Sequence, residues 1–390
     1  MEGENSVKSE GFAVSLRFLF VLVFFMQMLT GVVGLAVPIS AVGMGASPLF
    51  LGFIGAVGGL TYSFMPLAAG FFSDRVRRKS FILAALVLYG LSCVLYFLAG
   101  NPVVLVPVKA LEWVSVSVFW PSVEALLTES SRDRVEQSLR RFNLSWGSAT
   151  IVGPVVGGLV ISLFGVKVPF VLSSTVSFAL AFFAAVAVRE SIKGGHKPTR
   201  EASQPQKRGS GSIAAALAST LLFSFVGGII YNLFPAHATS LGIQPYEIGV
   251  VMFFNGLFRL AAFFEAYRIE GKIGKIGMFL AGSLTLAFAC GLTLASSTTA
   301  MFILTFSFFG FGTGLLYAAS IAFILKSWSS SKGYAAGLFE SLIGVGSILG
   351  SSTGGFVSEF YALNAPYLLG LCVSLAISFF HSVHMFRKRR

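Results

Sequence analysis

The chain contains a series of long apolar segments, and these limit the folds open to it more than any other feature. About twenty apolar residues suffice for a helix to cross the hydrocarbon core of a membrane. Because 55% of the residues are hydrophobic, a water-soluble globule could not bury them all. The pattern predicts an all-α integral membrane protein with twelve transmembrane helices. We place them at residues 15–38, 48–72, 80–99, 102–128, 140–163, 167–188, 212–235, 245–267, 276–296, 299–325, 336–360 and 365–385.

Lysine and arginine are distributed unevenly between the predicted loops. All but three of the 28, namely Lys109, Lys167 and Arg259, lie in the termini or in or beside the even-numbered loops. Positive charge is retained on the cytoplasmic side of membrane proteins, so both termini are predicted to be cytoplasmic. We expect a multi-pass protein of the cell membrane whose basic loops contact membrane lipids. Since topology explains the net charge of +12, nucleic acid is not expected as a partner.

A polar segment rich in Gly, Pro and Ser runs from Arg189 to Ser212, between the sixth and seventh apolar segments. Such a composition is typical of a flexible linker. We therefore divide the chain into an N-terminal six-helix bundle at 1–188, a cytoplasmic linker at 189–211 and a C-terminal six-helix bundle at 212–390. We expect the protein to be a monomer.

The two halves of the chain are related by an internal repeat. Sliding the sequence by 197 residues pairs eleven glycines or prolines without a gap, where roughly two or three would coincide by chance. Gly and Pro mark close helix contacts and kinks, so the halves should share their packing. An even number of helices per repeat predicts two parallel, pseudo-symmetric halves with a substrate site between them near the midplane. The pairs are 31/228, 45/242, 52/249, 59/256, 147/344, 153/350, 157/354, 158/355, 38/235, 48/245 and 169/366.

A cluster of charged residues, GFFSDRVRRK, lies at 70–79 between the second and third apolar segments. A glycine followed four residues later by Asp-Arg and then by basic residues resembles the cytoplasmic signature of the major facilitator superfamily, a family of membrane transporters. The resemblance is carried by Gly70, Asp74, Arg75, Arg78 and Lys79, while Arg77 stands where that family usually has glycine.

In that family, the Asp and Arg of this motif hold the two halves together when the cytoplasmic side is closed. The resemblance implies that Asp74 contacts the start of the eleventh segment near Glu340, where a helix N-terminus favours an anion. It also implies that Arg78 pairs with Glu129 or Glu124. The alternative is that the charges only retain this loop in the cytoplasm.

Two further stretches carry weaker resemblances to the same family. GPVVGG in the fifth segment, with Gly153, Pro154, Gly157 and Gly158, resembles a motif associated with exporters, although Ala149 replaces the usual upstream glycine. KALEW at 109–113 resembles the family's Arg-x-x-Gln-Gly in the fourth segment. Together these motifs imply a likeness to the multidrug or exporter-like members.

The fourth segment carries charged groups where lipid would make them costly. At 100° per residue, one arc of the helix presents Lys109, Glu112, Trp113, Ser117, Trp120 and Glu124. One hypothesis is a cavity-lining stripe, with Glu112 and then Glu124 as carriers of a coupling proton and the tryptophans as substrate walls. The alternative is that Lys109 and Glu112, one turn apart, form a structural ion pair.

Other polar residues inside predicted segments are candidate contacts to a substrate. Asn255 and Arg259 lie one turn apart in the eighth segment, and Arg259 is expected to contact substrate, relay protons or pair with an acid. The resemblance implies that segments one, four, seven and ten line the cavity, although each polar group there could instead make a helix–helix hydrogen bond. These remaining candidates are Gln27, Thr30, Tyr231, Asn232 and Tyr317.

Signatures of enzymes and metal sites are lacking in the sequence. It contains no P-loop, nucleophile elbow or HExxH motif, so neither an enzyme nor direct ATP drive is expected. The three cysteines lie far apart in apolar segments, and the four histidines do not join them, so no metal and no cofactor are expected. We interpret His381 and His384 as anchors at the membrane interface.

These features predict a secondary active transporter that moves a small solute by alternating access of its two halves. The many aromatic residues favour a lipophilic or amphipathic solute. We expect this solute to be exported by coupling to protons. Proton-coupled uptake or exchange of a metabolite, such as a sugar, an organic acid or an amino acid, is the first alternative. A non-transporting membrane receptor or assembly partner is the second, and buried charges argue against it because a scaffold does not need them.

Overall fold

The computed structural model describes residues 2–73, 78–131, 135–188, 210–327 and 332–389. Within those ranges the regular structure is helical, and every helix is long and apolar enough to cross a membrane. The helices are α1 (Glu2–Gly43), α2 (Pro48–Ser73), α3 (Arg78–Leu98), α4 (Pro102–Ser131), α5 (Val135–Phe164), α6 (Val168–Ala187), α7 (Ser210–Ser240), α8 (Pro245–Leu294), α9 (Thr299–Ser327), α10 (Lys332–Phe360) and α11 (Ala365–Arg389).

Helix α8 contains two of the predicted membrane crossings. It is 50 residues long, or about 75 Å if straight, which is more than twice the hydrocarbon thickness of a bilayer. It bends at Gly274, whose φ of 70° lies in the left-handed region that other residues rarely adopt. With α8 counted as two crossings, the prediction of twelve transmembrane segments is confirmed.

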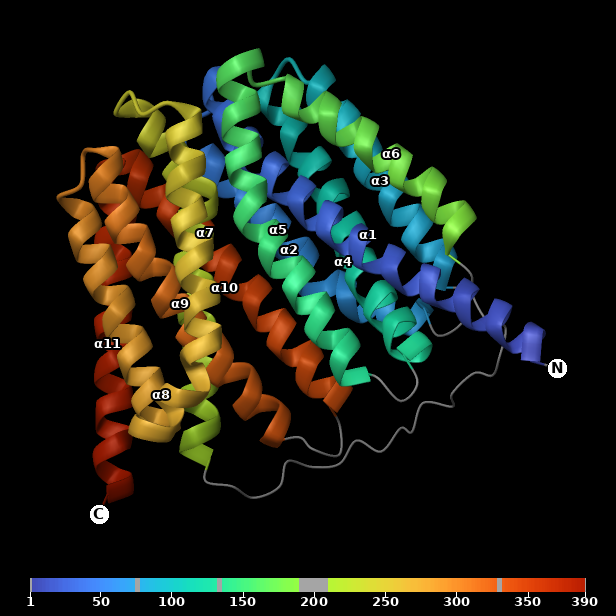
Figure 1. Cartoon of the computed structure of the whole chain (residues 1–390). Helices are drawn as coiled ribbons and strands as arrows, with labels where there is room; N and C mark the ends of the chain where they lie inside the picture. The colour runs from blue at the N-terminus through green and yellow to red at the C-terminus, as the bar shows by residue number, and fades with distance from the viewer. Residues whose placement is uncertain (1, 74–77, 132–134, 189–209, 328–331, 390) are drawn as a thin grey trace.

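The helices form two bundles side by side (Figure 1), α1–α6 in one half and α7–α11 in the other. Both chain ends lie at the same end of the molecule in Figure 1, and the loops at 44–47 and 241–244 lie at the other, which we call the distal end.

The predicted 197-residue repeat reappears in the helix boundaries. Helix starts coincide in this register at Pro48 and Pro245, at 102 and 299, at 135 and 332, and at 168 and 365. Gly45 and Gly242, which follow α1 and α7, have nearly the same positive φ, 81° and 78°. The two halves are therefore repeats of one six-helix unit.

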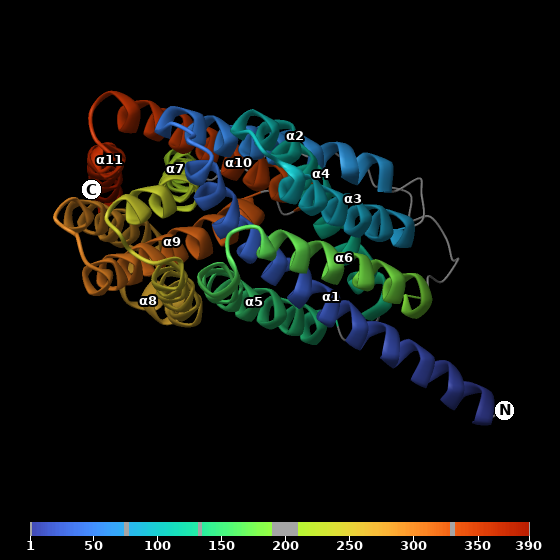
Figure 2. The ribbon, with the colours of Figure 1, turned by 90° about the horizontal axis from the view of Figure 1, so that it is seen from above.

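The halves meet along two seams that obey the same pseudo-symmetry. In Figure 2, the α2–α10 seam and the α5–α8 seam lie on opposite sides of the molecule. A Cβ on Gly59 of α2 would lie 3.0 Å from Cγ1 of Ile348, and one on Gly256 of α8 would lie 3.1 Å from Cγ1 of Ile151. Gly59 and Gly256 are 197 residues apart in the sequence, and so are Ile151 and Ile348.

The GPVVGG stretch of α5 packs against two helices at once. Gly153 and Gly157 face α1, where a Cβ on Gly153 would lie 2.6 Å from the carbonyl oxygen of Met28. Gly158 faces the other half, against the carbonyl oxygen of Pro245. These glycines let backbones approach too closely for any larger side chain.

His381 lies inside the second half, so its interpretation as an interfacial anchor is wrong. Its side chain is 0% exposed. The ring nitrogens lie 3.2 Å from Ser219 Oγ on α7 and 3.4 Å from Ser283 Oγ on α8. A buried polar ring needs such partners, and His381 thereby ties α11 to both helices.

Candidate functional site

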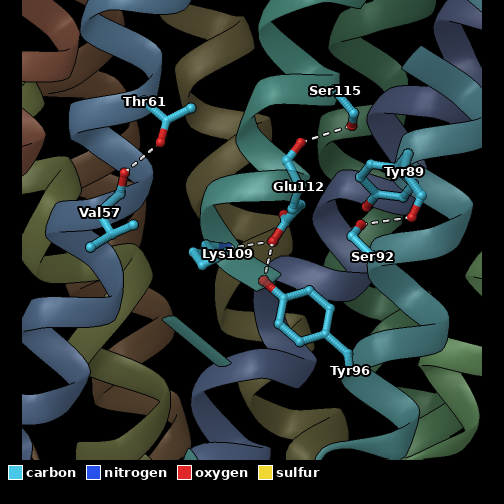
Figure 3. Close-up of polar contacts among 8 residues, drawn as sticks. All are labelled: Val57, Thr61, Tyr89, Ser92, Tyr96, Lys109, Glu112 and Ser115. Atoms are coloured by element: carbon cyan, nitrogen blue, oxygen red, sulfur yellow. Dashed lines mark hydrogen bonds and ion pairs between the residues drawn. The ribbon is translucent and has the colours of Figure 1, made fainter. Parts of the chain in front are cut away.

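The first group of buried charges centres on Glu112 in α4 (Figure 3). Its Oε2 accepts a hydrogen bond of 2.7 Å from Tyr96 Oη of α3 and one of 2.9 Å from Lys109 Nζ. Glu112 is 0% exposed and Lys109 is 6% exposed. The predicted pairing of Lys109 with Glu112 is thus present, and Tyr96 is a partner that the sequence analysis missed.

Several polar atoms beside this pair have no hydrogen-bond partner. They are Oε1 of Glu112, Nε1 of Trp113 and Oγ of Ser117, all buried on α4. Buried polar groups are nearly always paired, so each of these atoms is an open position for a hydrogen-bond partner. Glu112 Oε1 can accept a hydrogen bond from another group.

Lys109 also reaches the boundary between the halves. It helps to line a small cavity of about 10 Å³, room for roughly one water, together with Asn232 of α7. Asn232 donates 3.0 Å bonds to Ser351 Oγ of α10 and to its own helix at Gly228. The predicted candidate Asn232 therefore links helices of the second half and faces the first.

A second group lies on the α2–α10 seam. Tyr62 Oη of α2 donates a 2.8 Å hydrogen bond to Glu340 Oε2 of α10. Glu340 is in turn within electrostatic reach of Glu124 of α4, whose side chain is exposed. The ring of Tyr62 lies 5.3 Å from Trp113, edge to face, so this group adjoins the Glu112 cluster.

Tyr317 of α9 lies beside the same seam. Its ring contacts Phe339 of α10 at 5.1 Å and Phe263 of α8 at 5.5 Å. Its hydroxyl is within electrostatic reach of Glu340 and of Arg259. Tyr317 thus lies between the acidic group and the basic group described next.

A third group lies on the α5–α8 seam around Arg259. Its guanidinium donates a 3.3 Å bond to Tyr231 Oη of α7 and lies 5.7 Å from the ring of Trp146 of α5, in the other half. Tyr231 in turn donates to Asn255 Oδ1 at 3.2 Å. Among the described residues no carboxylate lies within salt-bridge distance of Arg259, so the predicted pair with an acid is not found in that part of the chain.

Two other candidates, Thr30 and Trp120, make contacts within or next to their own helices. Thr30 Oγ1 donates to the carbonyl of Met26 at 2.8 Å, within α1. Trp120 packs on the rings of Phe119 and Phe142. Gln27 is half-buried on α1.

The predicted latch falls largely outside the described part of the chain. Asp74 and Arg75 lie in the gap at 74–77, and Gly70 and Glu129 belong to stretches whose side chains are not described. Arg78 starts α3. Glu340 is eight residues beyond the start of α10 and bonds Tyr62, so the latch stays a prediction.

Twelve membrane crossings in two repeats, with charged groups buried along and between them, define a membrane transporter. The sequence profile described as Major Facilitator Superfamily matches residues 19–258 and 216–390. The chain belongs to this family.

Several relatives are similar at low identity over most of their length. Quinolone resistance protein NorA of Staphylococcus aureus (strain COL) is 22% identical over 371 residues, which cover 92% of this chain and 94% of the relative. Multidrug resistance protein 2 of Bacillus subtilis (strain 168) is 22% identical over 316 residues, covering 77% of this chain and 76% of the relative.

Solved structures share the fold. The nucleoside transporter NupG superposes with a TM-score of 0.75 at 15% identity, over 94% of this chain and 98% of that chain. A POT family transporter in complex with 5-aminolevulinic acid gives a TM-score of 0.78 at 13% identity, over 94% of this chain and 95% of that chain. At such identities the likeness concerns the fold alone.

Proposed function

We propose that this secondary transporter exports a small amphipathic solute in exchange for protons. The family and the fold make it a transporter; the direction, the coupling ion and the solute are our proposal. Multidrug and quinolone resistance proteins among its relatives support export, and the GPVVGG packing of α5 against α1 and α8 is consistent with it.

The observation that carries proton coupling is the state of Glu112. Its carboxylate is fully buried, one oxygen is held by Tyr96 and Lys109, and the other has no partner. A carboxylate in such surroundings is costly to keep charged unless its neighbours compensate it. A change in those neighbours as the halves rock would therefore change its affinity for a proton, which couples protonation to conformation.

We further infer that residues 1–188 and 212–390 move as two bodies joined by the segment at 189–211, with both termini in the cytoplasm of the cell. In this orientation the distal end faces outward. Asp74 and Arg78 would then close the cytoplasmic side, as the family's signature implies, with lipid head groups beside the basic loops.

Flux in proteoliposomes tests the proposal. Protein reconstituted with a pH gradient should drive a fluorescent amphiphile such as ethidium against its concentration gradient, and an uncoupler should abolish that movement. Uphill movement that persists after the pH gradient has been collapsed would contradict proton coupling. A receptor or scaffold would move no solute at all, with or without the gradient.

A further inference from the structure

The two seams between the halves are equivalent in geometry but opposite in charge. Tyr62 and Arg259 are related by the 197-residue repeat, and each lies fourteen residues after the first residue of its helix, Pro48 or Pro245. Both are therefore about 21 Å along their helices from the distal end. One seam has a carboxylate at this depth, since Tyr62 bonds Glu340, and the other has the guanidinium of Arg259.

From this arrangement we infer that the transported solute is a zwitterion, with its anionic group bound by Arg259 and its cationic group by Glu340. This inference rests on the proposed transport function. In alternating access the solute passes between the halves, so the groups on the seams become walls of its path when the halves separate. A solute in that path faces the positively charged Arg259 on one side and the negatively charged Glu340 on the other.

Arg259 has the surroundings of an anion-binding group. It lies deep in the membrane-spanning part of α8, without a carboxylate at salt-bridge distance among the described residues. Its guanidinium contacts a neutral tyrosine hydroxyl and the Trp146 ring. Such a cation is costly within the membrane unless an anion compensates it. The planar guanidinium can donate two parallel hydrogen bonds to a carboxylate.

Glu340 can bind a cation without losing its present partner. Only Oε2 accepts from Tyr62, and a carboxylate has several lone pairs for further donors. The rings of Phe339 and Tyr317 lie beside this group and those of Trp146 and Tyr231 lie beside Arg259. The flanking rings suit a solute with an aromatic or otherwise apolar body between its two charges.

The repeat shows that this charge asymmetry is not a consequence of duplication. The counterpart of Glu340 in the first half is Asn143, and the counterpart of Trp146 in the second half is Ile343. Neither carries charge. At these repeat positions the acid is therefore present on one seam only. The arginine, whose counterpart is Tyr62, is present only on the other.

A series of three probes with one scaffold tests the inference. Norfloxacin is a zwitterion, its ethyl ester is a cation and its N-acetyl derivative is an anion. Binding to purified protein, measured by isothermal titration calorimetry, should be about tenfold tighter for norfloxacin than for either derivative, because each derivative loses one charge-assisted contact. Equal or tighter binding of either derivative, or no binding of any of the three, would overturn the inference.

Two substitutions assign the charges. R259Q should weaken norfloxacin and the N-acetyl derivative and leave the ester unchanged, whereas E340Q should weaken norfloxacin and the ester and leave the N-acetyl derivative unchanged. R268Q, an exposed arginine of α8 that pairs with Glu265, is the matched control and should leave all three affinities unchanged. If R259Q weakens all three probes equally, Arg259 only supports the seam and the inference fails.

Measurements of flux separate this inference from the proposed function. If wild-type protein drives the ester uphill as fast as norfloxacin, transport stands and zwitterion recognition falls. If it binds norfloxacin preferentially but moves nothing uphill under a pH gradient, recognition stands and proton-coupled export falls. Where R259Q does not fold, the probe series on wild-type protein and R259K, which keeps the charge but not the planar fork, still decides the case.

Discussion

The carboxylate of Glu359, near the end of α10, accepts a 3.1 Å hydrogen bond from the backbone N–H of Leu49 at the start of α2. Its counterpart on the other seam is a 3.0 Å bond from the N–H of Tyr246 at the start of α8 to Ser162 Oγ of α5. The two donors are 197 residues apart in the sequence, and so are the two acceptors. At the distal end, therefore, each half caps the first turn of a helix in the other half.

These two caps should stabilise distal closure independently. Removing a capping side chain leaves a first-turn N–H without its acceptor. Glu359→Ala should therefore speed hydrogen–deuterium exchange of residues 48–52, by roughly two- to fivefold, and leave residues 245–249 unchanged. Ser162→Ala should have the reverse pattern. The two variants serve as controls for each other, and equal effects on both segments would show that the caps do not act separately.

Close packing of the GPVVGG stretch gives a second prediction. In Gly153→Ala the new Cβ would lie 2.6 Å from the carbonyl oxygen of Met28, a backbone atom that cannot move alone. We expect a loss of about 1–3 kcal/mol in stability, as for other overpacked sites, seen as a lower melting temperature in detergent. Gly271→Ala, where nothing lies within 4 Å of the added carbon, is the control. If both variants melt alike, the close approach of α5 to α1 is not what holds this bundle together.

His381 gives a third prediction. His381→Leu would leave Ser219 Oγ without its hydrogen-bond partner among the described residues and would remove one of the three hydrogen bonds of Ser283 Oγ. Such losses cost about 1–3 kcal/mol, so the melting temperature should fall. Val383→Leu, on the same turn at a position 37% exposed, should not change it. If His381→Leu is as stable as the wild type, the ring has only a peripheral role and its hydrogen bonds to α7 and α8 do not stabilise the fold.

The sequence sufficed for the fold because membrane crossing depends on local composition. Each apolar run had to become a helix to satisfy its backbone within lipid, and the repeat fixed which helices correspond. The break expected between the eighth and ninth segments lies at Gly274, whose backbone leaves the helical region between the two crossings of α8.

The site was predictable only within single helices. Lys109 and Glu112 are three residues apart on one helix, so their pairing follows from helix geometry. The bond from Tyr62 to Glu340 joins residues 278 positions apart, and no local pattern specifies it. One signal was available in the sequence. The repeat pairs Tyr62 with Arg259, so both halves have a polar residue at the same depth, and such a pair of positions indicates a functional site.

The fourth prediction concerns Glu112 itself. If this carboxylate carries the coupling proton, Glu112→Gln should abolish uphill transport and preserve downhill exchange, because the neutral amide resembles the protonated carrier. Uphill and exchange flux should be measured on the same proteoliposomes. Glu265→Gln, which changes an exposed carboxylate of α8, is the matched control and should retain both activities.

A purely structural ion pair makes a different prediction, and stability distinguishes the two. Lys109→Met leaves a buried carboxylate held by Tyr96 alone, which should cost about 3–5 kcal/mol under either role. Lys109→Met with Glu112→Leu removes both charges and should recover most of that loss. If the pair is only structural, this folded double variant also regains uphill transport. If Glu112 carries the proton, the double variant folds, exchanges solute downhill and transports nothing uphill, because the group that links protonation to the movement of the halves has been removed.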